Sequence, residues 1–524
     1  MAGFKTVVAM NAFKGGMSAV EASSMVAEGF SRGFWEAQVV AAPMADGGDG
    51  TLEVLLKCRG GYVETVSVTG PYGQTVEAPL GLIDGGTTAV IESASCSGLA
   101  LPYSGKRDVR IAQSRGVGEL MLAAAKKGVK RIVVGIGGTA MNDGGLGAAL
   151  AAGGEALDAA GDPVSAGVFG LRDVRRVSRG DIPRLFDGIE VVAITDVKNP
   201  LVGPEGATAV FGPQKGLSAG EVPLVDSYMA NYAEALARDL GRNPKDLPMA
   251  GAGGGLAAGL WAFFGAELKD GAAFVAGAID LPKIIEDASL VITGEGKVDS
   301  QTSMGKVPFA VASLAAEAGV PVVVIGGALG EEVVRGFPPE FAAVFDCTLR
   351  PMTVSEAVSE GPKNLLFVSE QIARLARACA VWRPTQTDLA VGGIAVRRDP
   401  DTGDREVLLI MDRFGMVAPP KGHPEEGETL EEAAEREVRE ETGLSVVSRA
   451  PIGSVRYRFP NPQGATEKVV HYFLMEVVGG EMTPQQGETL QVLWVNEKDL
   501  PGLRTYKDTH SIVKKALSAF ERVS

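Results

Sequence analysis

The segment Gly422–Leu444, GHPEEGETLEEAAEREVREETGL, has the most specific residue spacing in this chain. Gly422 is followed after five residues by Glu428, and after seven more by the adjacent pair Arg436 and Glu437. Two further glutamates and a second glycine complete the segment at fixed offsets. A merely solvated acidic helix would not require this spacing, which therefore indicates a functional site.

The second half of this segment predicts an α-helix from Thr429 to Thr442, ended by Gly443 as its C-cap. Residues at i, i+3 and i+4 share one face of a helix and lie within about 6 Å of each other. Three carboxylates have this spacing: Glu437, Glu440 and Glu441. Ionised carboxylates so close repel one another unless a cation lies between them, and hard oxygen ligands suit Mg²⁺ or Mn²⁺.

A plain solvated helix is the alternative interpretation. Glu432 and Arg436, like Glu435 and Arg439, have the i,i+4 spacing of ordinary surface ion pairs. Such pairs explain part of the charge pattern but not the glycines at the two ends of the segment. We therefore predict a metal site at which substrate phosphates complete the coordination.

The segment resembles the Nudix box, G-x5-E-x7-R-E-U-x-E-E-x-G-U with U a bulky aliphatic residue, at every defined position. The resemblance extends from about Asp388 to the C-terminus. It implies an α+β Nudix fold that hydrolyses a nucleoside diphosphate linked to another group, with a divalent metal. Arg436 would hold the carboxylates in place, and Glu428 would support the loop before the helix. The implied metal ligands, one of which would also orient or deprotonate the water, are Glu437, Glu440 and Glu441.

Two flanking stretches, PPKGHPEEGE and VVHYFLMEV, are most similar to the diadenosine polyphosphate hydrolase branch of that family. The resemblance implies a nucleoside polyphosphate as the ligand. Lys421 would contact a phosphate, and Tyr472 would stack on a base. Glu488, shortly before a predicted strand, is a candidate for a further metal ligand.

Length and charge limit the other possibilities. A chain of 524 residues is too long for one hydrophobic core and predicts several domain-sized units. The net charge of −15 argues against binding to a nucleic-acid polymer, which needs a basic surface. We find no signal peptide and no apolar run long enough to span a membrane, so we expect a cytoplasmic protein without membrane contact. No pattern predicts the oligomeric state.

The N-terminal part alternates strands and helices, with a glycine-rich loop after most strands. Residues 5–10 predict a buried strand, residues 18–34 a helix that begins with a capping box, and residues 38–41 a second strand. Short β-like runs between residues 62 and 92 indicate an inserted sheet of mixed or antiparallel strands. The glycine-rich loops cover residues 11–16, 45–51, 137–145, 211–216 and 294–302.

Such loops form anion sites, because free backbone N–H groups at a helix start point toward phosphate. No G-x-x-x-x-G-K-[ST] loop is present in the sequence. All three histidines lie beyond residue 422, so a general base in the N-terminal part must be a carboxylate or a lysine. We predict a phosphoryl-transfer site in which loop amides and lysines hold nucleotide phosphates, carboxylates hold Mg²⁺, and one carboxylate accepts the proton of a hydroxyl.

Six motifs occur in the order found in bacterial glycerate kinases, which the chain resembles over about residues 4–378. They are MNAFKGGMSAVEA, ADGGDGT, GIGGTAMNDGG, TDVKNPL, FGPQKG and ITGEGKVDSQTSMGK. The resemblance implies a Rossmann-like α/β domain with a second α/β domain inserted into it. It also implies ATP, Mg²⁺ and D-glycerate as ligands, with 2-phosphoglycerate as the product.

These patterns together predict an α/β kinase followed by an α+β Nudix domain. A helix from about Pro362 to Cys379 would end the kinase. The expected ranges are 1–380 for the kinase, with its inserted part at roughly 65–285, then 381–387 for the linker and 388–524 for the Nudix domain.

The glycerate kinase resemblance also implies functional residues. Asp46 and Asp196 are the candidates for the base that faces the glycerate hydroxyl. Lys14 and Lys297 would contact a carboxylate or a phosphate. The other expected contacts with nucleotide or metal are Gly137, Gly138, Asn142, Asp143, Lys215, Glu295 and Asp299. For Asp143, a structural role as the cap of its own loop is an equal alternative.

Three hypotheses cover the fused chain. In the first, both parts are active enzymes. In the second, the Nudix part is a nucleotide sensor that regulates the kinase. In the third, the kinase part is a degenerate binding module, because Met10-Asn11-Ala12 stands where the family pattern has Pro-Asp-Ser and Met141 stands where it has Thr.

Overall fold

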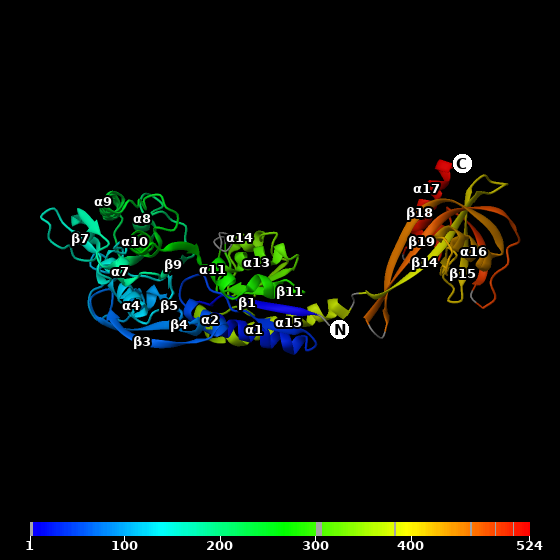
Figure 1. Cartoon of the computed structure of the whole chain (residues 1–524). Coiled ribbons are helices and arrows are strands. Elements are labelled where there is room, and N and C mark those ends of the chain that lie inside the picture. Colours follow the sequence, from blue (N-terminus) through cyan, green and yellow to red (C-terminus); the bar gives the residue numbers. More distant parts are fainter. Residues whose placement is uncertain are drawn as a thin grey trace. The chain divides into compact units, whose positions relative to one another are not determined.

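The computed structural model describes residues 4–299, 306–381, 384–461, 464–487, 489–506 and 508–523. The chain forms two compact units, Met1–Ala376 and Arg377–Ser524, which are described separately below (Figure 1). No helix among the described residues is both long and apolar enough to cross a lipid bilayer.

A fully parallel five-stranded sheet organises the first lobe of unit one. Its order is β13-β12-β11-β1-β2, and Figure 1 labels two of its strands, β1 and β11. Nearly every residue of β1 and β11 is buried, as parallel strands covered on both faces require. The predicted strands β1 and β2 are confirmed. The strands are β1 (Lys5–Met10), β2 (Gln38–Ala41), β11 (Leu290–Glu295), β12 (Val322–Gly326) and β13 (Ala343–Asp346).

The strand order reverses between β1 and β11. The chain moves from β1 to β2 on one side, and from β11 to β12 and β13 on the other. β1 and β11 pair in parallel from Thr6 with Leu290 to Met10 with Gly294. Open α/β sheets bind ligands where the order reverses, outside the carboxyl ends of the strands. This edge is therefore where a site is expected.

A six-stranded mixed sheet forms the second lobe of unit one, in the order β10-β9-β6-β5-β4-β3. β5, β6, β9 and β10 are parallel, whereas β3, β4 and β5 form an antiparallel meander. The predicted β-like runs thus form the antiparallel part of a mixed sheet, as expected. The strands are β3 (Gly61–Thr69), β4 (Thr75–Ile83), β5 (Thr88–Glu92), β6 (Arg131–Gly135), β9 (Glu190–Thr195) and β10 (Glu267–Asp270). A small pair, β7 (Glu155–Leu157) and β8 (Arg176–Ser178), lies outside it.

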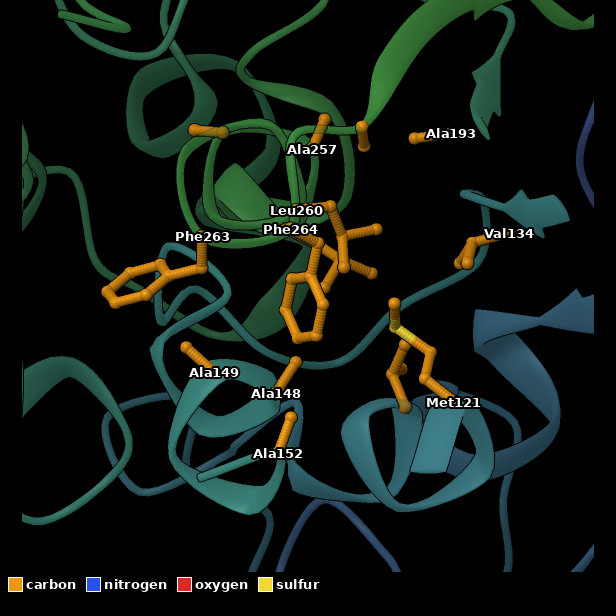
Figure 2. Close-up of a cluster of buried hydrophobic side chains, with 14 of the residues drawn as sticks. Met121, Val134, Ala148, Ala149, Ala152, Ala193, Ala257, Leu260, Phe263 and Phe264 are labelled. Atoms are coloured by element: carbon orange, nitrogen blue, oxygen red, sulfur yellow. The ribbon is translucent and has the colours of Figure 1, made fainter. Parts of the chain in front are cut away.

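Small residues allow helices to pack closely in the second lobe. Figure 2 shows Met121, Ala148 and Leu260 in its core. A Cβ at Gly145 would lie 2.9 Å from the Cα of Gly259, so these backbones touch directly. The described helices of unit one are α1 (Ala19–Gly33), α2 (Thr51–Arg59), α3 (Ser93–Ser97), α4 (Arg115–Lys126), α5 (Leu146–Ala151), α6 (Val168–Asp173), α7 (Ile182–Leu185), α8 (Ala207–Phe211), α9 (Val222–Leu240), α10 (Ala252–Gly259), α11 (Gly271–Ala278), α12 (Leu281–Ile285), α13 (Val307–Glu317) and α14 (Glu331–Arg335).

Helix α15 (Val354–Val381) is longer than the sequence predicts. The expected start was Pro362, which instead lies inside the helix. Thr353 precedes the helix, and its N–H and hydroxyl donate to the Glu356 carboxylate at 2.8 Å. The Glu356 N–H donates back to the Thr353 hydroxyl at 3.3 Å, which completes a capping box. The T-x-x-E pattern was the overlooked signal.

The second unit is a sheet covered by one helix on each face. The strand order is β16-β15-β14-β19-β18, with β17 paired to β14 and β20 to β15. Alternate residues of β14 face opposite cores: Ile394 lies in the core with α17, and Val391 in the core with α16. The elements are β14 (Pro384–Arg398), β15 (Arg405–Asp412), β16 (Val417–Ala418), β17 (Lys421–Gly422), α16 (Leu430–Thr442), β18 (Leu444–Asn461), β19 (Gly464–Gly480), β20 (Thr489–Asn496) and α17 (Thr509–Val523).

The expected linker at 381–387 differs from the structure. α15 continues to Val381, and β14 begins at Pro384. The reason is that the start of β14 already pairs with β19, beginning at the pair of residues 384 and 465. Ordered backbone therefore extends into the polar segment from both sides.

Candidate active sites

Glycines bring together three loops at the carboxyl edge of the first sheet. A Cβ at Gly296, in the loop after β11, would lie 3.3 Å from the backbone nitrogen of Lys14 and from the Cα of Phe13. Both of these residues lie in the loop after β1. A Cβ at Gly327, after β12, would lie 2.6 Å from the Gly296 carbonyl oxygen. Close backbone contact thus places Lys14 beside the loop that contains Glu295.

The loop after β2 joins the two lobes. Gly47 has a left-handed φ of +91°, and a Cβ there would lie 3.0 Å from the Ile194 carbonyl at the end of β9. A Cβ at Gly271 would lie 2.0 Å from the Asp46 carbonyl oxygen. Asp46 is buried, and its carboxylate accepts the Gly48 N–H at 3.0 Å. The loop therefore holds Asp46 close to Asp196, which directly follows β9.

Asp196 lies among charges that come from both lobes. Its side chain is exposed at this junction, yet crowding by the surrounding loops removes part of its hydration. Partial loss of hydration raises the pKa of Asp196, and the Asp46 carboxylate raises it further, while Lys14 and Lys306 lower it. Three predicted residues are thus brought together, and Lys306 joins them from the segment that precedes α13.

Asp143 is fully buried and satisfied by its own surroundings. Its carboxylate accepts the Ser114 N–H at 2.8 Å and the Ser114 hydroxyl at 2.9 Å. It also accepts the N–H groups of Gly145 at 3.2 Å and Gly147 at 3.1 Å. Burial raises the pKa of Asp143, and these hydrogen bonds offset part of that rise. The geometry favours the structural alternative, in which Asp143 shapes its loop.

Lys215 is also buried beneath the glycine-rich loops. Its Nζ donates to the Met141 carbonyl at 2.6 Å and lies 3.5 Å from the Thr139 hydroxyl. A Cβ at Gly254 would lie 2.9 Å from this Nζ. Burial lowers the pKa of Lys215 to about 8, although Asp143 raises it. Lys215 therefore joins its own loop to the loop that contains Thr139 and Met141, and its side chain is not open to solvent.

The remaining predicted residues of this part divide between two loop groups. Asn142 is buried and donates to the Thr208 hydroxyl at 3.0 Å. A Cβ at Gly137 would lie 3.0 Å from the Gly48 Cα, and Gly138 has a positive φ of +60°, so this loop abuts the Asp46 loop. In the other group, Glu295 is buried at the end of β11. Lys297 forms an ion pair of 3.1 Å with Asp299.

In the second unit, α16 matches the predicted helix. Thr429 is its N-cap and forms a capping box with Glu432. Gly443 is the C-cap, with a left-handed φ of 75°. The predicted helix and its C-cap glycine are confirmed.

Arg436 and Gly422 set the positions of the α16 carboxylates. The Arg436 guanidinium donates to Glu428 at 2.8 and 3.0 Å, to Glu437 at 3.0 Å and to Glu440 at 3.3 Å. The Arg436 hydrogen bond lowers the pKa of Glu428 to about 2. A Cβ at Gly422 would lie 2.0 Å from the Glu437 carboxylate, so a larger residue here would displace that carboxylate. The carboxylate of Glu441 is buried and accepts the Lys421 N–H at 2.8 Å.

Two family models cover most of the chain: "Glycerate kinase family" matches residues 6–377, and "NUDIX domain" matches residues 387–517. The chain belongs to the glycerate kinase family. Glycerate 2-kinase of Escherichia coli K12 is 41% identical over 70% of this chain and 97% of its own length. Glycerate kinase of Bacillus subtilis 168 is 40% identical over 70% of this chain and 97% of its own length. A crystal structure of a candidate glycerate kinase 2 from Salmonella typhimurium LT2 has 36% identity and a TM-score of 0.64, over 72% of this chain and 99% of that chain.

The fused chain is therefore an enzyme that joins a glycerate kinase to a Nudix hydrolase domain. The predicted fold, an α/β kinase followed by a Nudix domain, is confirmed. Kinases of this kind and Nudix hydrolases generally use ATP and divalent metal ions.

The metal ligands predicted in the Nudix domain do not converge as the helix spacing suggested. Among the residues that the structure describes, no three His, Cys, Asp or Glu side chains are placed to share one metal ion. The reason is that Arg436 binds both Glu437 and Glu440, while Glu441 turns toward the Lys421 N–H. The carboxylate oxygens are nevertheless the donor type that a hard cation such as Mg²⁺ prefers. Glu488 lies outside the described residues.

Tyr472 is not placed to stack on a base. It is 6% exposed and packs in the core beneath α17. Two other tyrosines, Tyr457 and Tyr506, are 39% and 45% exposed. The hydrogen bond from Tyr506 to Asp412 is the main cause that raises the pKa of Tyr506. Tyr457 lies close enough to raise this pKa further. Sequence reasoning missed this pair, because nothing in the local pattern of residue 506 relates it to residue 457.

A cluster of one carboxylate, one histidine and one lysine near the Nudix helix was missed as well. His423 Nε2 lies 2.8 Å from the Asp388 carboxylate, and Lys468 Nζ lies 3.0 Å from it. The three residues come from β14, β19 and the loop after β17. His423 and Lys468 lie 35 and 80 residues after Asp388 in the sequence, so no local pattern indicates that the three residues meet.

Proposed function

We propose that this glycerate kinase transfers the γ-phosphoryl group of ATP to D-glycerate, giving 2-phosphoglycerate. Support comes from the meeting of Asp46, Asp196, Lys14 and Lys306 at the junction of the two lobes, which is the observation that carries the proposal. The Escherichia coli relative named glycerate 2-kinase supports the choice of the 2-hydroxyl.

Asp196 is the proposed base. The glycerate hydroxyl oxygen forms a bond to the γ-phosphorus while the bond from that phosphorus to the leaving ADP oxygen breaks. The hydroxyl proton passes to Asp196, whose raised pKa makes it a stronger proton acceptor than an ordinary carboxylate. Lys14 and Lys306 offset the negative charge of phosphate or glycerate. Glu295 and Asp299 would hold Mg²⁺, which neutralises charge on the phosphates.

The test is Asp196→Asn, with Asp187→Asn as the control, because Asp187 is an exposed carboxylate before β9, at the opposite end of that strand from Asp196. Turnover of ATP with D-glycerate should fall by about 10²–10⁴-fold in Asp196→Asn only. Phosphorus NMR of the product distinguishes the 2-phosphate from the 3-phosphate. A folded Asp196→Asn enzyme with the parent rate would show that Asp196 is not the base.

We further propose that the Nudix domain hydrolyses a dinucleoside polyphosphate with Mg²⁺ or Mn²⁺. The attacking water oxygen forms a bond to phosphorus, the pyrophosphate bond to the leaving phosphate oxygen breaks, and the water proton passes to a carboxylate of α16. Glu437, Glu440 and Glu441 would hold the metal, and Arg436 positions them. Support comes from the complete Nudix box and from Lys421, which stands one residue before Gly422.

The exposed tyrosines strengthen the choice of a nucleotide substrate. Tyr457 and Tyr506 offer aromatic surface beside the Asp412 and Lys421 charges, and aromatic rings stack well on nucleobases. Tyr457→Ala should raise the KM for diadenosine tetraphosphate by about tenfold, on the scale of one lost stacking contact. Leu490→Ala, an exposed apolar residue on β20, is the control.

Two alternatives predict different results. If the Nudix domain is a nucleotide sensor, a dinucleoside polyphosphate changes the glycerate kinase rate of the full chain, and Glu440→Gln alters that response. If the kinase part is a degenerate binding module, ATP and glycerate bind but no phosphoglycerate forms. Independent assays of both reactions on the full chain separate these outcomes.

A further inference from the structure

A small pocket lies at the reversal point of the first sheet, beside the proposed phosphoryl-transfer residues. Its volume is about 200 Å³. The loops after β1, β11 and β12 contribute Phe13, Lys14, Gly296 and Gly327 to its wall. The pocket therefore occupies the edge at which open α/β sheets bind their ligands.

One face of α15 forms the opposite wall. Val354, Ala357, Val358, Gly361 and Asn364 line the pocket, at the 3- and 4-residue spacing of a single helix face. Alanine and glycine in the middle of this face leave room for a flat ligand. A Cβ at position 361 would come within 3.2 Å of the Met17 side chain that faces it.

Asn364 contributes an amide side chain to the wall of the pocket. It is 3% exposed, and within the described ranges of the chain its side-chain amide makes no hydrogen bond. The amide is therefore available to a ligand in the pocket. Its donor and acceptor lie side by side, which matches the N6 amino group and N7 of adenine. An apolar slot with such an amide suits a purine ring better than it suits glycerate.

The position of Lys14 gives the bound nucleotide a direction. Lys14 lines the mouth of the pocket and is also close enough to Asp196 to lower its pKa. A nucleotide with its base in the pocket would extend its phosphates past Lys14 toward the proposed base.

We infer that this pocket binds the adenine ring of ATP and that Asn364 recognises its N6 and N7 edge. The inference rests on the proposed kinase function. It assigns the ring to the slot between α15 and the loops after β1 and β11.

The test measures ADP binding to the full chain by calorimetry in the presence of Mg²⁺. Asn364→Leu should weaken ADP binding about tenfold or more, the scale of one two-point base contact, and should leave the KM for glycerate unchanged. Val358→Trp fills the slot from a partly exposed position and should abolish binding. Gln371→Leu, on the exposed side of the same helix, should bind ADP as the parent does.

Three results decide the inference. Weaker ADP binding in both pocket variants, with unchanged melting temperatures, supports it. Parent-like ADP affinity in both variants overturns it while the kinase function stands. A parent chain that neither binds ADP nor phosphorylates glycerate overturns the kinase function and this inference together.

Discussion

At the scale of single residues, Gly422 explains why the Nudix box begins with glycine. Its Cα lies against the Glu437 carboxylate, where a methyl group would have to lie 2.0 Å from an oxygen. Arg436 then fixes the same carboxylate from the other direction at 3.0 Å. One absent methyl group and one guanidinium thus set the position of a proposed metal ligand.

We expect Gly422→Ala to lower Nudix hydrolysis by roughly 10²-fold, because a displacement of about 1 Å at a reacting group has that effect. Glycerate kinase activity of the same variant should not change. Gly479→Ala is the matched control, since its Cβ would meet nothing within 4 Å. Equal hydrolysis rates in the two variants would contradict the proposed role of Glu437.

Asp196 allows a prediction about pH. Its folded pKa is raised, so its contribution to stability is present below the unfolded pKa and is lost as pH rises through the folded pKa. At pH 7 the ionised group therefore destabilises the fold slightly, and Asp196→Asn should melt at the same or a higher temperature than the parent. At pH 4 the difference in melting temperature between Asp196→Asn and the parent should be smaller. Thermal unfolding at both values checks the sign, and a variant that is less stable at pH 7 would contradict it.

The same ionisation should control turnover. The base must be ionised to accept a proton, so the kinase rate of the parent should fall as pH decreases through the raised pKa of Asp196. Rate profiles between pH 4 and 8 test this. A profile that stays flat over that range would exclude a carboxylate base.

At the scale of elements, α15 matters most to the kinase, because it packs on α1 and forms a wall of the pocket. A Cβ at Gly29 of α1 would lie 2.0 Å from the Ser369 hydroxyl and 2.3 Å from the Leu366 carbonyl oxygen. A Cβ at Gly33 would lie 2.5 Å from the Glu370 carbonyl oxygen. The two helices therefore touch through their backbones, which a sequence pattern of isolated glycines does not reveal.

We expect Gly29→Ala to destabilise the kinase by about 1–3 kcal/mol, the usual effect of overpacking. Gly277→Ala in α11 should be neutral or stabilising by about 0.4–1 kcal/mol, because its Cβ would meet nothing and alanine restricts the unfolded chain. Denaturant unfolding of the two variants measures the difference. A Gly29→Ala enzyme with the same free energy of unfolding as the parent would show that α15 can shift without loss of stability.

At the scale of the whole molecule, each unit has its own hydrophobic cores and its own sheets. We propose that residues 1–380 and 388–524 fold independently. Calorimetry of the full chain should then show two unfolding transitions. With Mg²⁺ present throughout, added ADP should raise only the kinase transition, since a ligand stabilises only the unit that binds it. A single transition shifted as a whole would contradict this independence.

The sequence predicted the Nudix helix and its C-cap Gly443, because these depend on residue spacing within the single segment Gly422–Leu444. It also predicted strands β1 and β2 and the capping box of α1, which are local patterns. It could not predict that Lys215 is buried or that Tyr472 lies in a core. Burial depends on what distant segments place above a residue.

By itself, the sequence determined which residue types are available and which local elements they form. Only the tertiary structure decided which of them meet: Lys14, Asp46 and Asp196 follow three different strands, and Lys306 follows a fourth. The physical reason is that the parallel strands β1, β2 and β11 bring their carboxyl ends to one edge of the first sheet, and the loop after β2 contacts the end of β9 in the second sheet. Backbone contacts at glycines then set the distances between the loops, and no linear pattern encodes those distances.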